Sequence, residues 1–189
     1  MILRYLLHML LVLPCLPILF FESKWVRSRI PHLPDAKNPE GVIKSKESET
    51  IRLIILGEST VAGIGVDQHE FGLPGSISKL LSDELNVNVS WKAYGRSGFT
   101  AKRILNETVP EIAMENIDLI AIALGGNDAF ELNTLWGWQS DTRRLIQALK
   151  VKFPNSKIAF MHMPPVKEFT GFTKTMKWAI GNLVNFFGD

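Results

Sequence analysis

Three short polar segments hold the residues of this chain whose types could do chemistry. They contain Ser59, Gly98 and Asn127, each within a run of small residues. A serine on a tight turn can present its hydroxyl to a carbonyl carbon, and glycine neighbours let that carbon approach closely. The backbone N–H groups of Ser59 and Gly98, together with the side-chain amide of Asn127, could stabilise the oxyanion that forms when an ester is attacked. These residue types predict acyl transfer through a serine nucleophile.

Each polar segment follows an apolar run that is typical of a strand covered on both faces. These runs span residues 51–56, 89–94 and 118–124, and a fourth run, 157–163, stops at a pair of prolines. Segments of helical period separate the four runs. Alternating strands and helices predict an open, mostly parallel sheet with helices on both faces. Ligands bind at the carboxyl ends of the strands in such sheets, and the three polar segments fall at those ends.

The segments LGESTVAGIG, YGRSGFTA and ALGGNDAF, in this order, resemble the first three sequence blocks of the SGNH/GDSL hydrolase family. The resemblance covers residues 51–165. It implies a three-layer α/β/α sandwich of the SGNH/flavodoxin-like kind and a serine esterase or lipase without a cofactor. Ser59 would be the nucleophile, and Gly98 and Asn127 would be oxyanion-hole donors. The substrate would be a small-molecule or glycan ester, acyl or O-acetyl. Glu58 departs from the family pattern, which usually has Asp before the serine.

The family's closing Asp-x-x-His block, in which the histidine takes the serine proton, has no match in this chain. The chain has only His8, His32, His69 and His162. A serine hydroxyl without a base is a poor nucleophile at neutral pH. We therefore expect a truncated hydrolase domain, residues 51–189, that lacks its C-terminal portion and has little or no esterase turnover. Should turnover nevertheless depend on the serine, His162 would be the first candidate base.

Plainer interpretations exist for each of these residues. Ser59 could cap a following helix, since serine is a favoured N-cap. Gly98 and Asn127 could serve turns, and Asp128 suits a helix cap or a hydrogen-bond acceptor better than a catalytic acid. His162 lies between two methionines, which favours a core histidine. The alternative function is a noncatalytic protein that binds an ester or a glycan in the same strand-end pocket.

The composition argues against several other classes of protein. Lys and Arg number 21 against 19 Asp and Glu, so there is no global electrostatic case for nucleic acid. The single cysteine, Cys15, cannot form an intramolecular disulfide. No HExxH or CxxC pair predicts a metal site, and no phosphate-binding loop motif is found.

The N-terminal segment is expected to lie outside the soluble core. Residues 5–21 carry no fixed charge and would form a helix of roughly 26 Å, between a signal-peptide core and a short transmembrane helix. Without a small-x-small cleavage site, residues 1–21 favour an uncleaved membrane anchor. More Lys and Arg follow the segment than precede it, which favours a cytoplasmic domain over an exported one. A buried hydrophobic helix is the alternative. Residues 22–50, rich in Pro and charged residues, are expected to form a linker.

Overall fold

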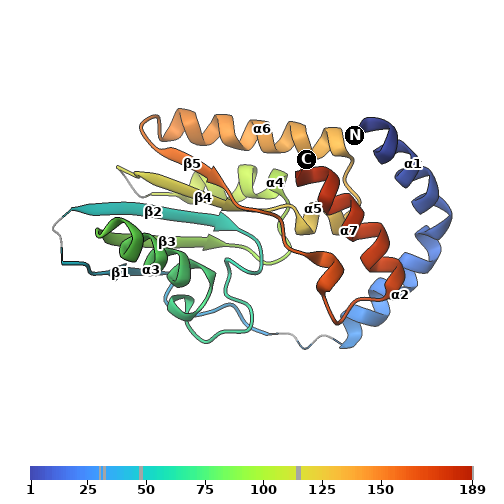
Figure 1. Ribbon diagram of the computed structural model, residues 1–189, viewed down its shortest axis with the longest axis horizontal. Coiled ribbons are helices and arrows are strands. Elements are labelled where there is room, and N and C mark those ends of the chain that lie inside the picture. The colour runs from blue at the N-terminus through green and yellow to red at the C-terminus, as the bar shows by residue number, and fades with distance from the viewer. Residues whose placement is uncertain (30, 32, 47–48, 114–115, 189) are drawn as a thin grey trace.

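A mixed β-sheet forms the centre of the protein. The computed structural model describes residues 1–29, 31, 33–46, 49–113 and 116–188. Within them the strands are β1 (Glu40–Ile43), β2 (Thr50–Gly57), β3 (Asn88–Gly95), β4 (Leu119–Ala123) and β5 (Lys157–Phe160). They lie in the order β1-β3-β2-β4-β5, with β1 antiparallel to β3 and the other neighbours parallel (Figure 1). The mostly parallel sheet predicted from the sequence is therefore confirmed.

Helices cover both faces of the sheet. Helix α3 (Leu73–Leu85) packs on one face of the sheet, in front of the lower strands in Figure 1, and α6 (Leu135–Lys152) packs on the other face. The segment after β3 packs on the same face as α6. It begins as α4 (Ala101–Arg103) and continues through the π-helical η3 (Ile104–Thr108) and the 3-10 turn η4 (Val109–Glu111). Further elements after β2 are η2 (His69–Phe71), α5 (Gly126–Phe130), η5 (Val166–Glu168) and α7 (Lys174–Gly188).

Strand β2 is buried on both sides, which explains its continuous apolar sequence. Leu53 and Ile55 belong to the hydrophobic cluster between the sheet and α3. Ile54 and Leu56 belong to the larger cluster on the opposite face, between the sheet and α6. All four side chains are fully buried. Burial of such a side chain contributes about 1.5–3 kcal/mol, so the strand is fixed firmly at the centre of the sheet. Its carboxyl end then sets the position of the segment that contains Ser59.

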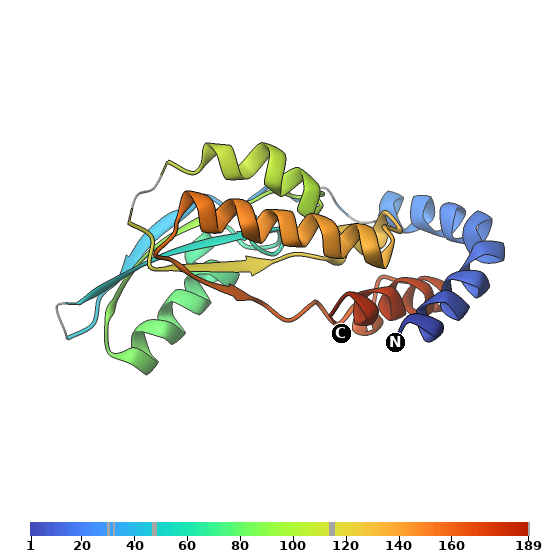
Figure 2. The same cartoon turned by 90° about the horizontal axis from the view of Figure 1, so that it is seen from above.

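The N-terminal segment packs on the C-terminal helix. It consists of α1 (Ile2–Val12), the 3-10 turn η1 (Leu13–Cys15) and α2 (Leu16–Arg29). Figures 1 and 2 both show α1 beside α7 at one end of the molecule. The Leu135 backbone N–H donates to the Tyr5 hydroxyl at 3.1 Å, and His8 Nε2 lies 2.9 Å from the Ala179 carbonyl oxygen. One face of the segment belongs to the larger hydrophobic cluster through Tyr5, Val12, Leu19 and Val26, so the expectation that the segment lies outside the core is wrong. Residues 2–29 are also long and apolar enough to cross a membrane, although a signal sequence or a core helix would pass the same test.

Two regular elements fall within residues 22–50, the range expected to be a linker. Helix α2 continues to Arg29, and Glu40–Ile43 forms the edge strand β1. Glu40 forms an ion pair with Lys92 of β3 at 2.8 Å. Strand β1 has four residues and two aliphatic side chains, so its sequence alone gives little periodic signal. The division of the chain into residues 1–21, 22–50 and 51–189 stays a prediction.

Candidate active site

The turn after β2 carries Ser59. The backbone N–H groups of Val61 and Ala62 both donate to the Glu58 carbonyl oxygen, at 3.0 and 2.9 Å, and fold the chain back at this point. Ser59 is half-buried, and its backbone N–H makes no hydrogen bond with the residues that the structure describes. The helix that follows, α3, begins at Leu73 and has Gly72 as its N-cap. The interpretation of Ser59 as a helix cap is therefore wrong.

Close backbone contacts hold this turn against the neighbouring strands. A Cβ atom on Gly95, at the end of β3, would lie 2.1 Å from the Ala62 nitrogen. A Cβ atom on Gly57 would lie 2.5 Å from the Ala123 carbonyl oxygen, at the end of β4. The Arg96 backbone N–H donates to the Gly57 carbonyl oxygen at 3.0 Å and ties the ends of β2 and β3 together. These positions require glycine because the backbone itself occupies the space.

Glu58 links the Ser59 turn to the segment after β4. Its Oε1 accepts a hydrogen bond from the Gly125 backbone N–H at 2.5 Å, and its Oε2 accepts one from the Asn127 backbone N–H at 2.9 Å. The side chain is buried, with only 8% exposed. Burial raises the pKa of Glu58 from its ordinary value of 4.5 to about 7, because it outweighs the lowering effect of the two N–H donors. Sequence reasoning identified Glu58 only as a departure from Asp and missed this contact.

Asn127 is also bound to the segment that contains Gly98. The Asn127 Nδ2 donates to the Phe99 carbonyl oxygen at 3.0 Å. Because a side-chain amide has two N–H donors, a second one stays available. Gly98 has φ +79°, a backbone conformation that favours glycine, and its N–H makes no hydrogen bond within the described part of the chain. Through Glu58 and Phe99, the structure therefore joins the segments of Ser59, Gly98 and Asn127.

Asp128 has a structural role. Its Oδ2 accepts a hydrogen bond from the Ala101 backbone N–H at 2.9 Å, at the start of α4. Its Oδ1 accepts one from Asn133 Nδ2 at 3.0 Å. Asp128 is fully buried, and this burial raises its pKa above the usual range. The prediction that Asp128 is a cap or an acceptor is confirmed.

The structure places three of the four histidines, and none of them is hydrogen-bonded to Ser59. His8 contacts α7, as described above, and His69 is buried with its Nδ1 3.0 Å from the Lys37 carbonyl oxygen. His162 is exposed and makes no hydrogen bond with a described residue, so its interpretation as a core histidine is wrong. The physical reason is that β5 already ends at Phe160. His32 lies outside the described residues.

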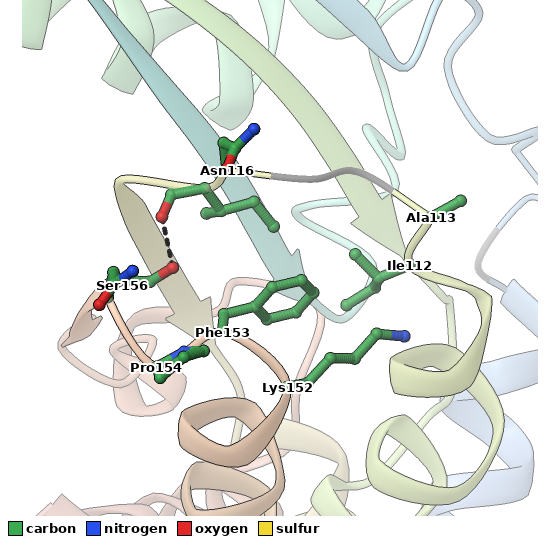
Figure 3. A pocket seen from close by; sticks show the side chains of 9 residues that line it. Ile112, Ala113, Asn116, Lys152, Phe153, Pro154 and Ser156 are labelled. Carbon is green, nitrogen blue, oxygen red and sulfur yellow. Dashed lines mark hydrogen bonds between the residues drawn. The ribbon is translucent and has the colours of Figure 1, made fainter.

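A cavity of about 480 Å³ lies far from these segments along the strands. Figure 3 shows Ile112, Lys152 and Phe153 among the residues that line it. Its walls include Asn116 and Ser156, which precede β4 and β5, so it lies near the amino ends of these strands. Ligand sites in parallel sheets lie at the opposite, carboxyl edge. This cavity does not belong to the candidate active site.

The buried Glu58 carboxyl predicts a pH-dependent stability. Its pKa is about 7 in the folded protein and 4.5 at its ordinary value, so the folded state binds the proton more tightly. The contribution of the protonated Glu58 carboxyl to the free energy of unfolding is complete below about pH 4.5 and is lost as the pH rises to about 7. The free energy of unfolding of the natural chain should therefore decrease over this pH range. In the Glu58→Gln variant, we expect the decrease to be smaller by up to roughly 3 kcal/mol. Urea denaturation at about pH 5 and about pH 8 measures the change, and an equal decrease in both proteins would contradict it.

The comparisons with known proteins agree with this fold. A sequence model described as the GDSL-like Lipase/Acylhydrolase family matches residues 55–185. A comparison with curated protein sequences gives no match. Among solved structures, one entitled TesA is 22% identical with a TM-score of 0.54, and the alignment covers 72% of this chain and 68% of that one.

Two further solved structures are esterases by title. AlinE4, an SGNH-hydrolase family esterase, is 21% identical with a TM-score of 0.50, and the alignment covers 74% of this chain and 75% of AlinE4. Axe2, in a W215I form, is an acetyl xylan esterase from Geobacillus stearothermophilus. It is 15% identical with a TM-score of 0.50, and the alignment covers 74% of this chain and 72% of Axe2. Because these sequence identities are low, the similarity to the three solved structures shows a shared fold.

Proposed function

The chain belongs to the GDSL-like lipase/acylhydrolase family, and on this premise we propose that it hydrolyses an acyl or O-acetyl ester with Ser59 as the nucleophile. The observation that carries the proposal is the pair of contacts made by Asn127. Its backbone N–H binds the carboxylate of Glu58, the neighbour of Ser59, and its side chain binds the carbonyl of Phe99, the neighbour of Gly98. One residue thus ties together all three segments that the reaction needs.

The proposed reaction has two steps. The Ser59 Oγ attacks the ester carbonyl carbon, and the carbonyl oxygen becomes an oxyanion. The backbone N–H groups of Ser59 and Gly98 and the free amide hydrogen of Asn127 stabilise that oxyanion. The C–O bond to the alcohol then breaks, the alcohol leaves with a proton, and the acyl group stays on Ser59. Water hydrolyses this acyl-enzyme to release the acid.

The proton of the serine hydroxyl needs a base, and this chain has no counterpart of the Asp-x-x-His block. His8 and His69 have other partners. We therefore propose that the chain alone turns over esters slowly or not at all. Oxyanion donors and binding still accelerate attack by about 10³–10⁴-fold over water when a catalytic triad is incomplete. A slow covalent reaction at Ser59 is thus expected even without a base.

We also propose that the N-terminal helix attaches the domain to a membrane. The segment Ile2–Arg29, which holds a stretch long and apolar enough to cross a membrane, supports this attachment. The basic residues Lys24, Arg27 and Arg29 follow the apolar part and favour a cytoplasmic domain.

The function is tested with a fluorescent fluorophosphonate, which reacts with activated serines. We expect the folded chain to become labelled slowly and the Ser59→Ala variant to stay unlabelled. A matched control is Ser76→Ala, which removes an exposed serine of α3 outside the candidate site and should label at the rate of the natural chain. None of the three described histidines is hydrogen-bonded to Ser59, which favours one competing function, noncatalytic binding of an ester or glycan. Ligand binding without any labelling would support that binder and overturn the esterase.

A further inference from the structure

A large apolar cavity separates α2 from α5 and α7. Its volume is about 980 Å³, at the upper end of the range usual for small-molecule sites, which is about 300–1,000 Å³. The walls include Leu19 and Val26 from α2, Met176 and Ile180 from α7, and Leu132 just after α5. Leu19, Val26, Met176 and Ile180 are each less than 10% exposed. The cavity therefore offers an apolar surface built from elements at both ends of the chain.

The cavity adjoins two of the three segments that form the candidate active site. Ser97 lines it and directly precedes Gly98. Phe130 also lines it and is the last residue of α5, the helix that carries Asn127. A molecule in the cavity would therefore extend along α2 and α7 with one end beside the proposed oxyanion donors.

Helix α2 has a second apolar face that points away from the cavity. Ile18, Phe21 and Trp25 recur at steps of three and four, do not line the cavity, and are 52%, 69% and 49% exposed. Such a helix is apolar toward both its protein side and its outer side, which is the pattern of a segment in contact with lipid. Arg27, at the polar end of α2, also lines the cavity and can attract an anionic headgroup.

Leu132 gives the cavity an apolar wall at a position that leucine rarely occupies. Its φ is +56°, in the left-handed region that glycine and asparagine adopt more readily. Its backbone N–H donates to the Ala129 carbonyl oxygen at 3.1 Å as α5 ends. An asparagine would suit this backbone better, but it would place an amide in the cavity. At this position the backbone conformation favours asparagine, whereas the apolar cavity favours leucine.

We propose that α2 is one wall of a binding site for the hydrocarbon chain of a long-chain acyl ester, which enters from the membrane between α2 and α7. The proposal rests on the proposed function, because the ester group of the bound lipid would lie at Ser97 and Gly98. The N-terminal segment then shapes the substrate site in addition to attaching the domain. Removal of α1 and α2 would open the cavity on one side.

The test uses the full chain in nanodiscs of phosphatidylcholine and phosphatidylglycerol that contain a phosphatidylcholine with a diazirine on its acyl chain. After illumination, mass spectrometry maps the cross-linked peptides. We expect adducts on the cavity residues Met176 and Ile180 in addition to adducts on the outer residue Phe21. Adducts confined to outer residues of α1 and α2 would overturn the proposal.

Two serines of α2 provide a matched pair of variants. The Ser23 hydroxyl donates to the Phe20 carbonyl oxygen at 2.9 Å, and the Ser28 hydroxyl donates to the Trp25 carbonyl oxygen at 2.8 Å. Both serines are exposed, but only Ser23 lines the cavity. We expect Ser23→Trp to reduce the cavity adducts at least fivefold and to keep the outer ones, and Ser28→Trp to change neither. Equal cavity labelling in both variants would contradict the proposal.

A third variant tests the same cavity in case Ser23→Trp does not fold. Leu132→Asn introduces a residue that tolerates the positive φ of this position, so the chain should fold. Its polar amide should nevertheless also reduce the cavity adducts at least fivefold. Ser59→Ala should leave cavity labelling unchanged. Cavity labelling in a chain that shows no fluorophosphonate reaction would therefore leave the lipid site standing and overturn the esterase alone, whereas Ser59 labelling without cavity adducts would overturn the lipid site alone.

Discussion

The Asn127→Ala variant is expected to react with a fluorophosphonate about 10²–10³-fold more slowly than the natural chain. The substitution removes the one side-chain donor of the proposed oxyanion hole. It keeps the backbone N–H that donates to Glu58 at 2.9 Å, so the segment after β4 should stay attached to the Ser59 turn. The measurement is the time course of labelling, read from the fluorescence of the protein band.

Asn106→Ala is the control for this result. Asn106 is exposed and has no part in the site, so its removal should leave the labelling rate unchanged. Thermal denaturation of both variants shows whether the loss of the Asn127 to Phe99 hydrogen bond has disturbed the fold. If Asn127→Ala labels at the rate of the natural chain and is equally stable, Asn127 is not an oxyanion donor.

The Gly95→Ala variant is expected to lose more than about 3 kcal/mol of stability. Its Cβ atom would lie 2.1 Å from the Ala62 nitrogen and 2.4 Å from the Ala62 Cα atom. These are backbone atoms, so no side-chain rotation relieves the contact, and either β3 or the Ser59 turn must move. Because the turn would shift, labelling of Ser59 should fall as well. Urea denaturation measures the free energy of unfolding.

Gly171→Ala is the matched control, because no atom lies within 4 Å of a Cβ atom at that position. We expect its free energy of unfolding to stay within about 0.5 kcal/mol of that of the natural chain. A Gly95→Ala variant as stable as Gly171→Ala would show that the turn does not lie against β3 as described.

The parallel strands could be predicted from the sequence because helices cover both faces of the sheet, and a strand buried on both faces has a continuous apolar sequence. Leu53 to Leu56 are all buried, so their apolar run is continuous, and the polar residues after each strand indicated the edge where ligands bind. Ser59, Gly98 and Asn127 could be identified because their types and surrounding motifs are local features. Their segments are joined by hydrogen bonds in the structure, whereas their chemical roles stay proposals.

Long-range contacts account for what the sequence did not predict. The bond between Tyr5 and Leu135 spans 130 positions, and the bonds of Glu58 span 67 and 69 positions. No local pattern specifies such partners. The same applies to β1, whose four residues become a strand only by pairing with β3. Packing of the N-terminal helices on α7 likewise depends on side chains far apart in the sequence.

A crystal structure of the chain after reaction with an alkyl fluorophosphonate tests the central claim most directly. The account predicts a bond from Ser59 Oγ to phosphorus, with the phosphoryl oxygen about 2.7–3.1 Å from the Gly98 nitrogen and from Asn127 Nδ2. An adduct on another serine would contradict the account. So would a Ser59 adduct whose phosphoryl oxygen points away from both Gly98 and Asn127.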